Sequence, residues 1–318
     1  MIYVSGATGK LGRPLVARLL ARGESVRALV RSAATAALPP AVELVEGDVT
    51  VPASLAGTLT GVTGVLHLVG RMSEGDPSDT ALRAELDRVN VDGSLALMRA
   101  ARAAGVRRFV YVSSCVVYGY RSGDAISADT PPTPETAYGG SKWAAEQALA
   151  RESGPELVVV RPALVAVGKS DRHDVIGEMV RLARRGLFPL PAAARGARKA
   201  LIAVGDVADG ILAALDRGRP GAAYVLAARR AFSLEEILGQ LSRLLGRRTT
   251  VPVPLALLNL AAYACDTVLA PLGLPAPIGA RRLAKLLRDQ QFDVSKSVTE
   301  LGFAPAVEDL EALLAPYL

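Results

Sequence analysis

Tyr138 and Lys142 stand four residues apart in the segment TAYGGSKWAAEQ, which starts at residue 136 and continues as a helix-forming run. On an α-helix, side chains four residues apart lie on one face, so the phenol and the ammonium can reach the same ligand. A cation beside a phenol favours the phenolate and lowers the pKa of the tyrosine from about 10. The pair could therefore act as an acid and a base. Because this spacing also arises by chance on solvated helices, other residues must decide.

Three glycines follow the first predicted strand, MIYVSG. Gly6, Gly9 and Gly12 form a GxxGxxG pattern that leads directly into a predicted helix. Glycines allow a tight turn and close approach of the backbone, while the start of the helix presents amide hydrogens to a pyrophosphate. A glycine triplet alone is a weak signal, but its place at the opening of a strand–helix unit predicts a dinucleotide site.

The residues after the second and third predicted strands bear on the choice of dinucleotide. At the end of the second strand, an Asp or Glu binds the 2′-hydroxyl of the adenosine ribose, whereas an Arg accommodates a 2′-phosphate. Here SVRALV leads to Arg31 and Ser32, with no acidic residue, which favours NADP(H) over NAD(H). Asp48, in VEGDVT after the third strand, is a candidate for the adenine edge and equally for a turn or helix-capping residue.

Two serines end the fifth predicted strand, in FVYVSSCVVYG. Ligands of open parallel sheets bind beyond the carboxyl ends of the strands, so Ser113 and Ser114 are expected where a nicotinamide and a substrate would meet. A hydroxyl beside Tyr138 could bond the substrate oxygen. Taken singly, each serine fits strand-end capping as well.

Short aliphatic runs alternate with helical segments over the first half of the chain. The predicted strands are MIYVSG, SVRALV, VELVEGD, GVLHLVG, RRFVYVSS and ELVVVRPALVAV, and the predicted crossover helices are GRPLVARLLARG, ASLAGTL and VDGSLALMRAARAAG. This pattern predicts an α/β fold with a doubly wound parallel sheet of Rossmann type and a smaller, mostly helical C-terminal substrate domain. We expect the dinucleotide-binding domain over 1–167, with 201–227 returning to it, and a discontinuous substrate domain over 168–200 and 228–318.

Composition argues against several other classes. Half of the residues are hydrophobic and only 4% are aromatic, which is typical of aliphatic α/β packing rather than of a base-stacking nucleic-acid binder. The net charge of +6 comes from short, scattered clusters, so we predict a small-molecule substrate and no nucleic-acid partner. The apolar stretch 251–280 is broken by prolines and Asp266, which predicts no membrane span but allows a substrate lid or a partner surface.

Cysteine and histidine usage predicts no metal site and a reducing compartment. Cys115 and Cys265 form no CxxC pair, and His67 and His173 are the only histidines. A strand predicted from residue 2 leaves no room for a signal peptide, so the expected location is cytoplasmic.

Together these segments resemble the extended short-chain dehydrogenase/reductase family, the NAD(P)-dependent epimerase/dehydratase group. The matching motifs are GATGKLG at 6–12, GD at 47–48, HLVG at 67–70, NVDGS at 90–94, YGGSK at 138–142, RPALVAVG at 161–168 and VGDVADGI at 204–211. The resemblance implies that Tyr138 is the acid/base, that Lys142 holds the nicotinamide ribose and lowers the pKa of Tyr138, and that Ser114 is their hydroxyl partner and binds the substrate. The implied cofactor-binding residues are Gly6, Thr8, Gly9, Lys10, Leu11, Gly12, Arg31, Asp48, Val49, Leu68, Val69, Gly70, Asn90, Tyr138 and Lys142.

The substrate stays open at this point. The run RLAKLLRDQQFDVSKSVTELGFAPAVEDLEALL resembles the close of nucleotide-sugar members, so the leading expectation is epimerisation or keto-sugar reduction on a nucleotide-activated sugar. Arg198 would then bind the diphosphate, although a solvated loop explains this arginine equally well. The alternatives are an NADPH-dependent reductase or dehydrogenase of a hydrophobic alcohol or ketone, of steroid or flavonol type, and a non-catalytic NADPH-binding sensor or accessory subunit. The resemblance also suggests a homodimer formed through the helix that carries Tyr138.

Overall fold

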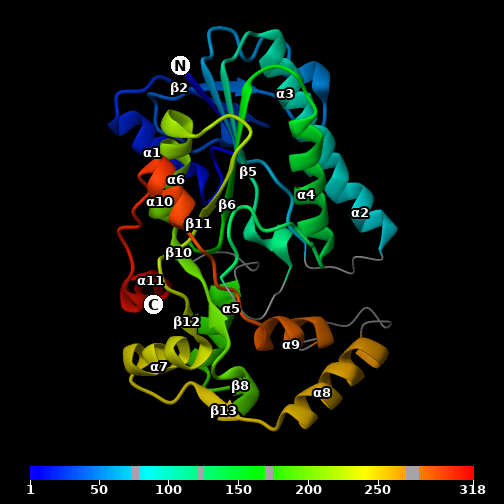
Figure 1. The fold of residues 1–318 in the computed structure, drawn as a ribbon, viewed down its shortest axis with the longest axis vertical. Helices are drawn as coiled ribbons and strands as arrows, with labels where there is room; N and C mark the ends of the chain where they lie inside the picture. The colour runs from blue at the N-terminus through cyan, green and yellow to red at the C-terminus, as the bar shows by residue number, and fades with distance from the viewer. Residues whose placement is uncertain (74–78, 120–124, 169–174, 270–278) are drawn as a thin grey trace.

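A seven-stranded parallel sheet forms the centre of the larger part of the protein (Figure 1). The computed structural model describes residues 1–73, 79–119, 125–168, 175–269 and 279–318. In spatial order the strands are β11 (Ala223–Leu226), β6 (Glu156–Pro162), β5 (Arg108–Val112), β4 (Gly64–His67), β1 (Ile2–Ser5), β2 (Val26–Val30) and β3 (Glu43–Glu46). The chain order reverses between β1 and β4, and in doubly wound sheets such a switch point is where ligands bind.

Helices cover both faces of this sheet, as parallel strands joined by crossover connections require. On one face α1 (Gly12–Ala21) packs beside α6 (Val204–Arg217). On the other face lie α2 (Thr80–Asp87), α3 (Gly93–Ala103) and α4 (Ala137–Ala150) (Figure 1). The predicted doubly wound α/β fold is confirmed.

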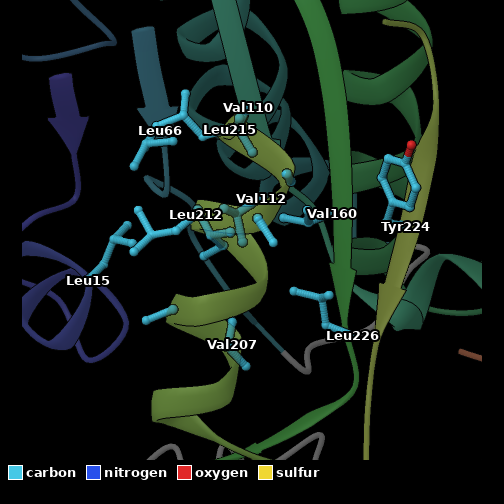
Figure 2. Close-up of a cluster of buried hydrophobic side chains, with 14 of the residues drawn as sticks. Leu15, Leu66, Val110, Val112, Val160, Val207, Leu212, Leu215, Tyr224 and Leu226 are labelled. Carbon is cyan, nitrogen blue, oxygen red and sulfur yellow. The ribbon is translucent and has the colours of Figure 1, made fainter. Parts of the chain in front are cut away.

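Aliphatic side chains from the strands hold α1 and α6 against the sheet. Figure 2 shows Leu15 of α1 and Leu212 of α6 beside Leu66, Val110 and Val160, which come from three neighbouring strands. These side chains are almost fully buried, and complete burial of one of this size stabilises the fold by about 1.5–3 kcal/mol. The sheet and its helices therefore form a rigid platform for the residues at its carboxyl edge.

A second, smaller apolar cluster lies beyond the carboxyl ends of the strands. It is built from short strand pairs and from helices in the second half of the chain. The paired strands are β7 (Leu164–Ala166) with β10 (Leu201–Ala203), β8 (Phe188–Leu190) with β13 (Thr250–Pro252) and β9 (Arg198–Lys199) with β12 (Phe232–Ser233). The helices of this cluster are α5 (Val175–Arg184), α7 (Leu234–Leu245) and α11 (Leu310–Leu314), with α9 (Ala280–Leu287) packed against it. Helix α8 (Leu255–Ala264) packs on α9, whereas α10 (Ser295–Leu301) packs on α6 and β11 of the large-sheet part.

Three sequence expectations differ from the structure. The run ELVVVRPALVAV is not one strand: it divides at Ala163 into β6 and β7, and β7 pairs with β10 outside the large sheet. The return to the large sheet is made by α6 and β11, not by residues 201–203. The segment ASLAGTL forms only a 3₁₀ turn, Pro52–Leu55, because Gly57 adopts a left-handed φ of 74° soon after it. Helix α2, ahead of the NVDGS motif, was not predicted.

Candidate active site

The glycine turn between β1 and α1 is built for close backbone approach. Gly6 has a φ of 79°, a conformation that glycine adopts without strain, and its carbonyl oxygen accepts the Gly9 amide at 3.0 Å. A methyl group on Gly12 would lie 2.2 Å from the Gly6 carbonyl oxygen, so no larger residue fits there. No side chain caps the start of α1, but the Arg13 amide donates to the Gly9 carbonyl at 3.1 Å and Pro14 has no amide hydrogen, so a ligand would meet the backbone of the glycine turn itself. This open backbone cradle fits a pyrophosphate.

Residues around this turn line an open pocket of about 330 Å³. The lining residues are Thr8, Val30, Arg31, Ser32, Thr35 and Ala36. Thr8 and Lys10 are exposed, whereas Leu11 is half-buried and packs on the core beneath α1. The pocket therefore combines hydroxyl groups and the Arg31 guanidinium, and no acidic side chain lines it.

Asp48 closes a turn. Its Oδ1 accepts both the amide and the hydroxyl of Thr50, each at 2.8 Å, and the backbone hydrogen bond is the main reason why the pKa of Asp48 is lowered. The charge of Arg31 lowers that pKa further. Val49 is buried and packs on Gly93. Of the two roles expected for Asp48, the turn is the one observed, and Val49 can offer a ligand only its backbone.

The loop after β4 runs past the side chain of Lys142. Leu68 and Val69 are half-buried on the two sides of the sheet, and Gly70 is exposed. A methyl group on Gly70 would lie 3.0 Å from the Lys142 Nζ and 3.4 Å from the Asn90 Oδ1. The structure thus brings Gly70, Asn90 and Lys142 together.

Asn90 connects this loop to α4. It lies in a π-helical turn, Arg88–Asp92, and is fully buried. Its Oδ1 accepts the Arg71 amide at 2.7 Å, and its Nδ2 donates to the Arg71 carbonyl at 2.9 Å and to the Ser141 hydroxyl at 2.8 Å. Every polar atom of the amide is engaged, so Asn90 fixes the loop next to the helix that carries Tyr138 and Lys142.

His67 is a neutral, structural histidine beneath the same loop. The Ser94 hydroxyl donates to the Asn90 carbonyl at 2.6 Å, so it accepts from the His67 Nε2 at 2.9 Å. The Nδ1 consequently accepts from the Ser5 hydroxyl at 2.6 Å. Burial, and then the charge of Lys142, lower the pKa of His67 to about 3.

Tyr138 and Lys142 lie in the first turns of α4, which Thr136 caps by accepting the Gly139 amide at 3.0 Å. The Lys142 Nζ donates to the Val112 carbonyl at 2.9 Å. Lys142 is 2% exposed, and its burial lowers the pKa to about 8, against the opposing charge of Glu146. The ammonium is therefore held at the carboxyl end of β5, and most of it stays protonated at neutral pH.

The expectation that Lys142 lowers the pKa of Tyr138 is wrong for the protein without ligands. Tyr138 is half-buried, and desolvation raises its pKa to about 12. The cost of burying a phenolate outweighs any help from the ammonium, which is directed to the Val112 carbonyl. At neutral pH the phenol is protonated, a state suited to donating a proton.

The two serines after β5 have different surroundings. Ser113 is buried and its hydroxyl donates to the Glu146 carboxylate. Ser114 is half-buried and caps a 3₁₀ turn by accepting the Val116 amide at 3.3 Å. Since that bond uses the Ser114 oxygen as an acceptor, its hydroxyl hydrogen can still be donated to a ligand.

Residues 2–227 match the model of the NAD dependent epimerase/dehydratase family. The chain belongs to this family. As a member, it is an NAD(P)-dependent enzyme of the epimerase, dehydratase or reductase type. The family assignment favours an enzyme over the non-catalytic sensor considered above.

Individual members of the family resemble the chain over nearly its whole length. A putative dihydroflavonol 4-reductase of Synechocystis is 34% identical, covering 94% of this chain and 89% of the relative. Sterol demethylase protein B of Methylococcus capsulatus is 32% identical, covering 95% and 93%. Among solved structures, that of gox2253 superimposes with a TM-score of 0.78 at 27% identity, covering 99% of this chain and 96% of the other.

Arg198 belongs to the short strand pairs of the smaller part of the protein. It is exposed in the two-residue strand β9, where its amide donates to Asp289 at 2.7 Å and its Nη1 to Gln291 at 3.3 Å. Its described hydrogen bonds are thus to the segment before α10, and its role in substrate binding stays a prediction.

Glu146 was not among the predicted site residues, although it contacts Ser113 and Arg161 next to them. Its carboxylate accepts from Ser113 and forms a buried ion pair with Arg161, at 2.6 Å between Oε2 and Nη2. Arg161 also donates to the Tyr118 hydroxyl at 2.6 Å. The signal was present, because Tyr138, Lys142 and Glu146 recur every four residues and so share one helix face.

Proposed function

We propose that this protein is an NADPH-preferring oxidoreductase that interconverts a ketone and a secondary alcohol on a hydrophobic substrate. The observation that carries the proposal is the position of the buried Lys142 ammonium, four residues after Tyr138 on α4 and against Gly70 and Asn90. Relatives that cover more than 90% of the chain support the substrate class, since they are named as reductases or sterol-processing proteins.

In the proposed mechanism the cofactor supplies or accepts the hydride, and the residues of the chain handle the proton. Tyr138, with a pKa of about 12, is protonated at neutral pH and donates its proton to the substrate oxygen as that oxygen gains charge. The nearby Lys142 ammonium stabilises the phenolate that remains. Ser114 donates its hydroxyl hydrogen to the same oxygen and orients the substrate. The glycine turn holds the pyrophosphate, and Asn90 keeps the loop at Gly70 in place.

The preference for NADPH rests on Arg31 and on the pocket that it lines with Thr8 and Ser32. A guanidinium can bind a 2′-phosphate through two parallel hydrogen bonds. The lining residues include no Asp or Glu, the residue types that bind the 2′-hydroxyl of NAD at this position. Fluorescence titration with NADPH and NADH tests this. Arg31→Ala should weaken NADPH binding about tenfold or more and leave NADH nearly unchanged, because hydrogen bonds between charged groups contribute about 1.5–3 kcal/mol.

The matched control is Arg107→Ala, which removes an exposed arginine at the opposite, amino-terminal edge of the sheet. An equal loss of NADPH affinity in both variants would contradict the role of Arg31. So would a wild-type protein that binds NADH as tightly as NADPH.

A nucleotide-activated sugar is the second candidate substrate. UDP-glucose 4-epimerase of Vibrio cholerae is 28% identical over 80% of this chain, and MoeE5 in complex with UDP-glucose and NAD superimposes with a TM-score of 0.73 at 28% identity. The exposed Arg195 and Arg198 favour a diphosphate.

Turnover assays separate the two candidates. Purified protein with NADPH is offered hydrophobic ketones in one series and UDP-sugars or their 4-keto forms in the other, and NADPH oxidation and product formation are followed. NADPH oxidation restricted to the first series supports the hydrophobic substrate. Turnover restricted to the second, with Arg198→Ala raising KM, supports the sugar instead. The homodimer also stays a prediction, which light scattering tests directly.

A further inference from the structure

Helix α8 presents an apolar surface outward. Of its ten residues only Leu258 and Ala262 are buried, against Leu283 of α9. Leu257 is 57% exposed, Leu260 65% and Tyr263 66%. Val251 just before the helix and Val268 just after it are also exposed. We call Val251, Leu257, Leu260, Tyr263 and Val268 the α8 surface.

Asp266 is the one charged residue in the sequence from Thr249 to Leu269. The stretch from Thr249 to Cys265 contains no charged residue, although exposed faces of water-soluble helices normally carry several. Figure 1 places α8 at the far end of the smaller part of the protein, away from the large sheet. A run of exposed large apolar side chains of this kind marks an interaction site.

Exposed arginines lie at the Val251 end of the α8 surface, where β13 begins. Parallel pairing of β13 with β8 brings Arg247 and Arg248 beside the turn at Arg185. A methyl group on the intervening Gly186 would lie 3.2 Å from the Arg248 carbonyl oxygen and 3.4 Å from an Arg247 guanidinium nitrogen. Asp266 is the acidic residue nearest in sequence to α8, and its Oδ2 accepts the Ala280 amide. The surface is therefore apolar along α8 and has a positive edge at its Val251 end.

We propose that the α8 surface and its arginine edge dock on an anionic phospholipid bilayer. An α-helix of ten residues is about 15 Å long, too short to span a bilayer but suited to lie in its interface. In the described ranges no helix has the length and apolar character needed to cross a bilayer. Leucine, valine and tyrosine enter the headgroup boundary, and the arginines meet the lipid phosphates.

A second copy of the chain fits this surface less well. In a two-fold interface each position meets a different position of the partner, so the arginines at one end of the surface would lie against apolar side chains and lose water without gaining a counter-charge. An anionic bilayer satisfies both the apolar helix and the positive edge. This inference goes beyond the proposed reaction and does not depend on it.

Co-sedimentation of the full chain with vesicles tests the proposal. One set is phosphatidylcholine alone, and the other also contains phosphatidylglycerol, an anionic lipid that attracts basic segments. We expect binding to the anionic vesicles that weakens with added salt. Arg247→Gln with Arg248→Gln should weaken it about twentyfold, since each basic residue near such a surface contributes about fivefold.

Matched variants separate docking from general effects of mutation. Leu260→Glu should weaken vesicle binding about tenfold or more, because it replaces an exposed apolar side chain that the bilayer would bury with a charged one. Val51→Glu makes the same change of charge at an exposed valine on the large-sheet part and should leave binding unchanged. Arg107→Gln with Arg151→Gln is the control for the arginine pair. Circular dichroism and thermal unfolding verify that each variant is folded.

Three results would overturn the proposal. The first is no binding of the wild-type chain to anionic vesicles. The second is equal binding by the Leu260→Glu and Val51→Glu variants. The third is a wild-type oligomer that Leu260→Glu converts to monomer in light scattering, which would assign the α8 surface to self-association.

Discussion

Glu146→Gln should be one of the most destabilising conservative substitutions in the protein. The carboxylate is 4% exposed and the facing Arg161 guanidinium 6%. Glu146 accepts three hydrogen bonds from Arg161 and one from Ser113. The amide keeps the shape of the side chain but leaves a buried guanidinium without a counter-charge. Breaking a buried ion pair in this way costs about 3–5 kcal/mol.

Thermal unfolding followed by circular dichroism measures this cost. For a chain of this size we expect Tm to fall by about 6–10 °C, since each kcal/mol corresponds to about 2 °C. The matched control is Asp209→Asn, which breaks an ion pair with Arg18 whose side chains are 35% and 51% exposed. Exposed pairs contribute about 0–1 kcal/mol, so Tm should move by less than about 2 °C. Equal shifts in the two variants would refute the reasoning that burial gives the Glu146–Arg161 pair its importance.

Three further predictions concern the site and its support. His67 has a pKa of about 3 in the folded protein, against 6.5 when unfolded, so its NMR signal should stay that of a neutral imidazole down to about pH 4. The free energy of unfolding should fall as pH drops from 6.5 towards 3, because the unfolded chain binds the proton first. A His67 signal that titrates near 6.5 would contradict the buried network. Lys142 has a pKa of about 8 in the folded protein, against 10.5 when unfolded, so the free energy of unfolding should rise by a few kcal/mol as pH increases from 8 to 10.5. Lys142→Met should abolish that part of the rise in urea titrations. An identical pH profile in the variant would be the contrary result. Gly12→Ala should lower the free energy of unfolding by about 2–3 kcal/mol, since its methyl group would lie 2.2 Å from the Gly6 carbonyl oxygen. Gly239→Ala inside α7, with open space around it, should raise the free energy of unfolding by about 0.5–1 kcal/mol. Similar effects at both positions would contradict the close packing of the turn.

The fold followed from the sequence where local pattern and tertiary packing agree. β1, β2 and β5 were predicted because buried parallel strands are continuous aliphatic runs. The run 156–167 looked like one strand for the same reason, and only tertiary pairing divides it at Ala163. Periodicity cannot state which sheet a strand joins, so the separate pairing of β7 with β10 was not predictable.

The site was predictable as a set of positions, but not as a set of contacts. Spacing and resemblance placed Tyr138, Lys142 and Asn90 in one neighbourhood, and the structure brings Lys142 and Asn90 to the same loop at Gly70. The pKa of Tyr138 was expected to be lowered, whereas burial raises it, because desolvation depends on the packing around the ring and not on spacing. Asp48 offered two readings: its hydrogen bonds to Thr50 show the turn, and contact with the adenine edge stays a prediction.

The proposed reaction depends on the phenol of Tyr138 acting as the proton donor beside the Lys142 ammonium. The most direct test is single-turnover NADPH oxidation with a ketone that the wild-type protein reduces, compared with Tyr138→Phe under saturating cofactor. We predict a rate at least about 100-fold lower in the variant, the usual contribution of a positioned acid, with NADPH affinity changed by less than about threefold. A variant that reduces the ketone at the wild-type rate would contradict the role of Tyr138 as the proton donor.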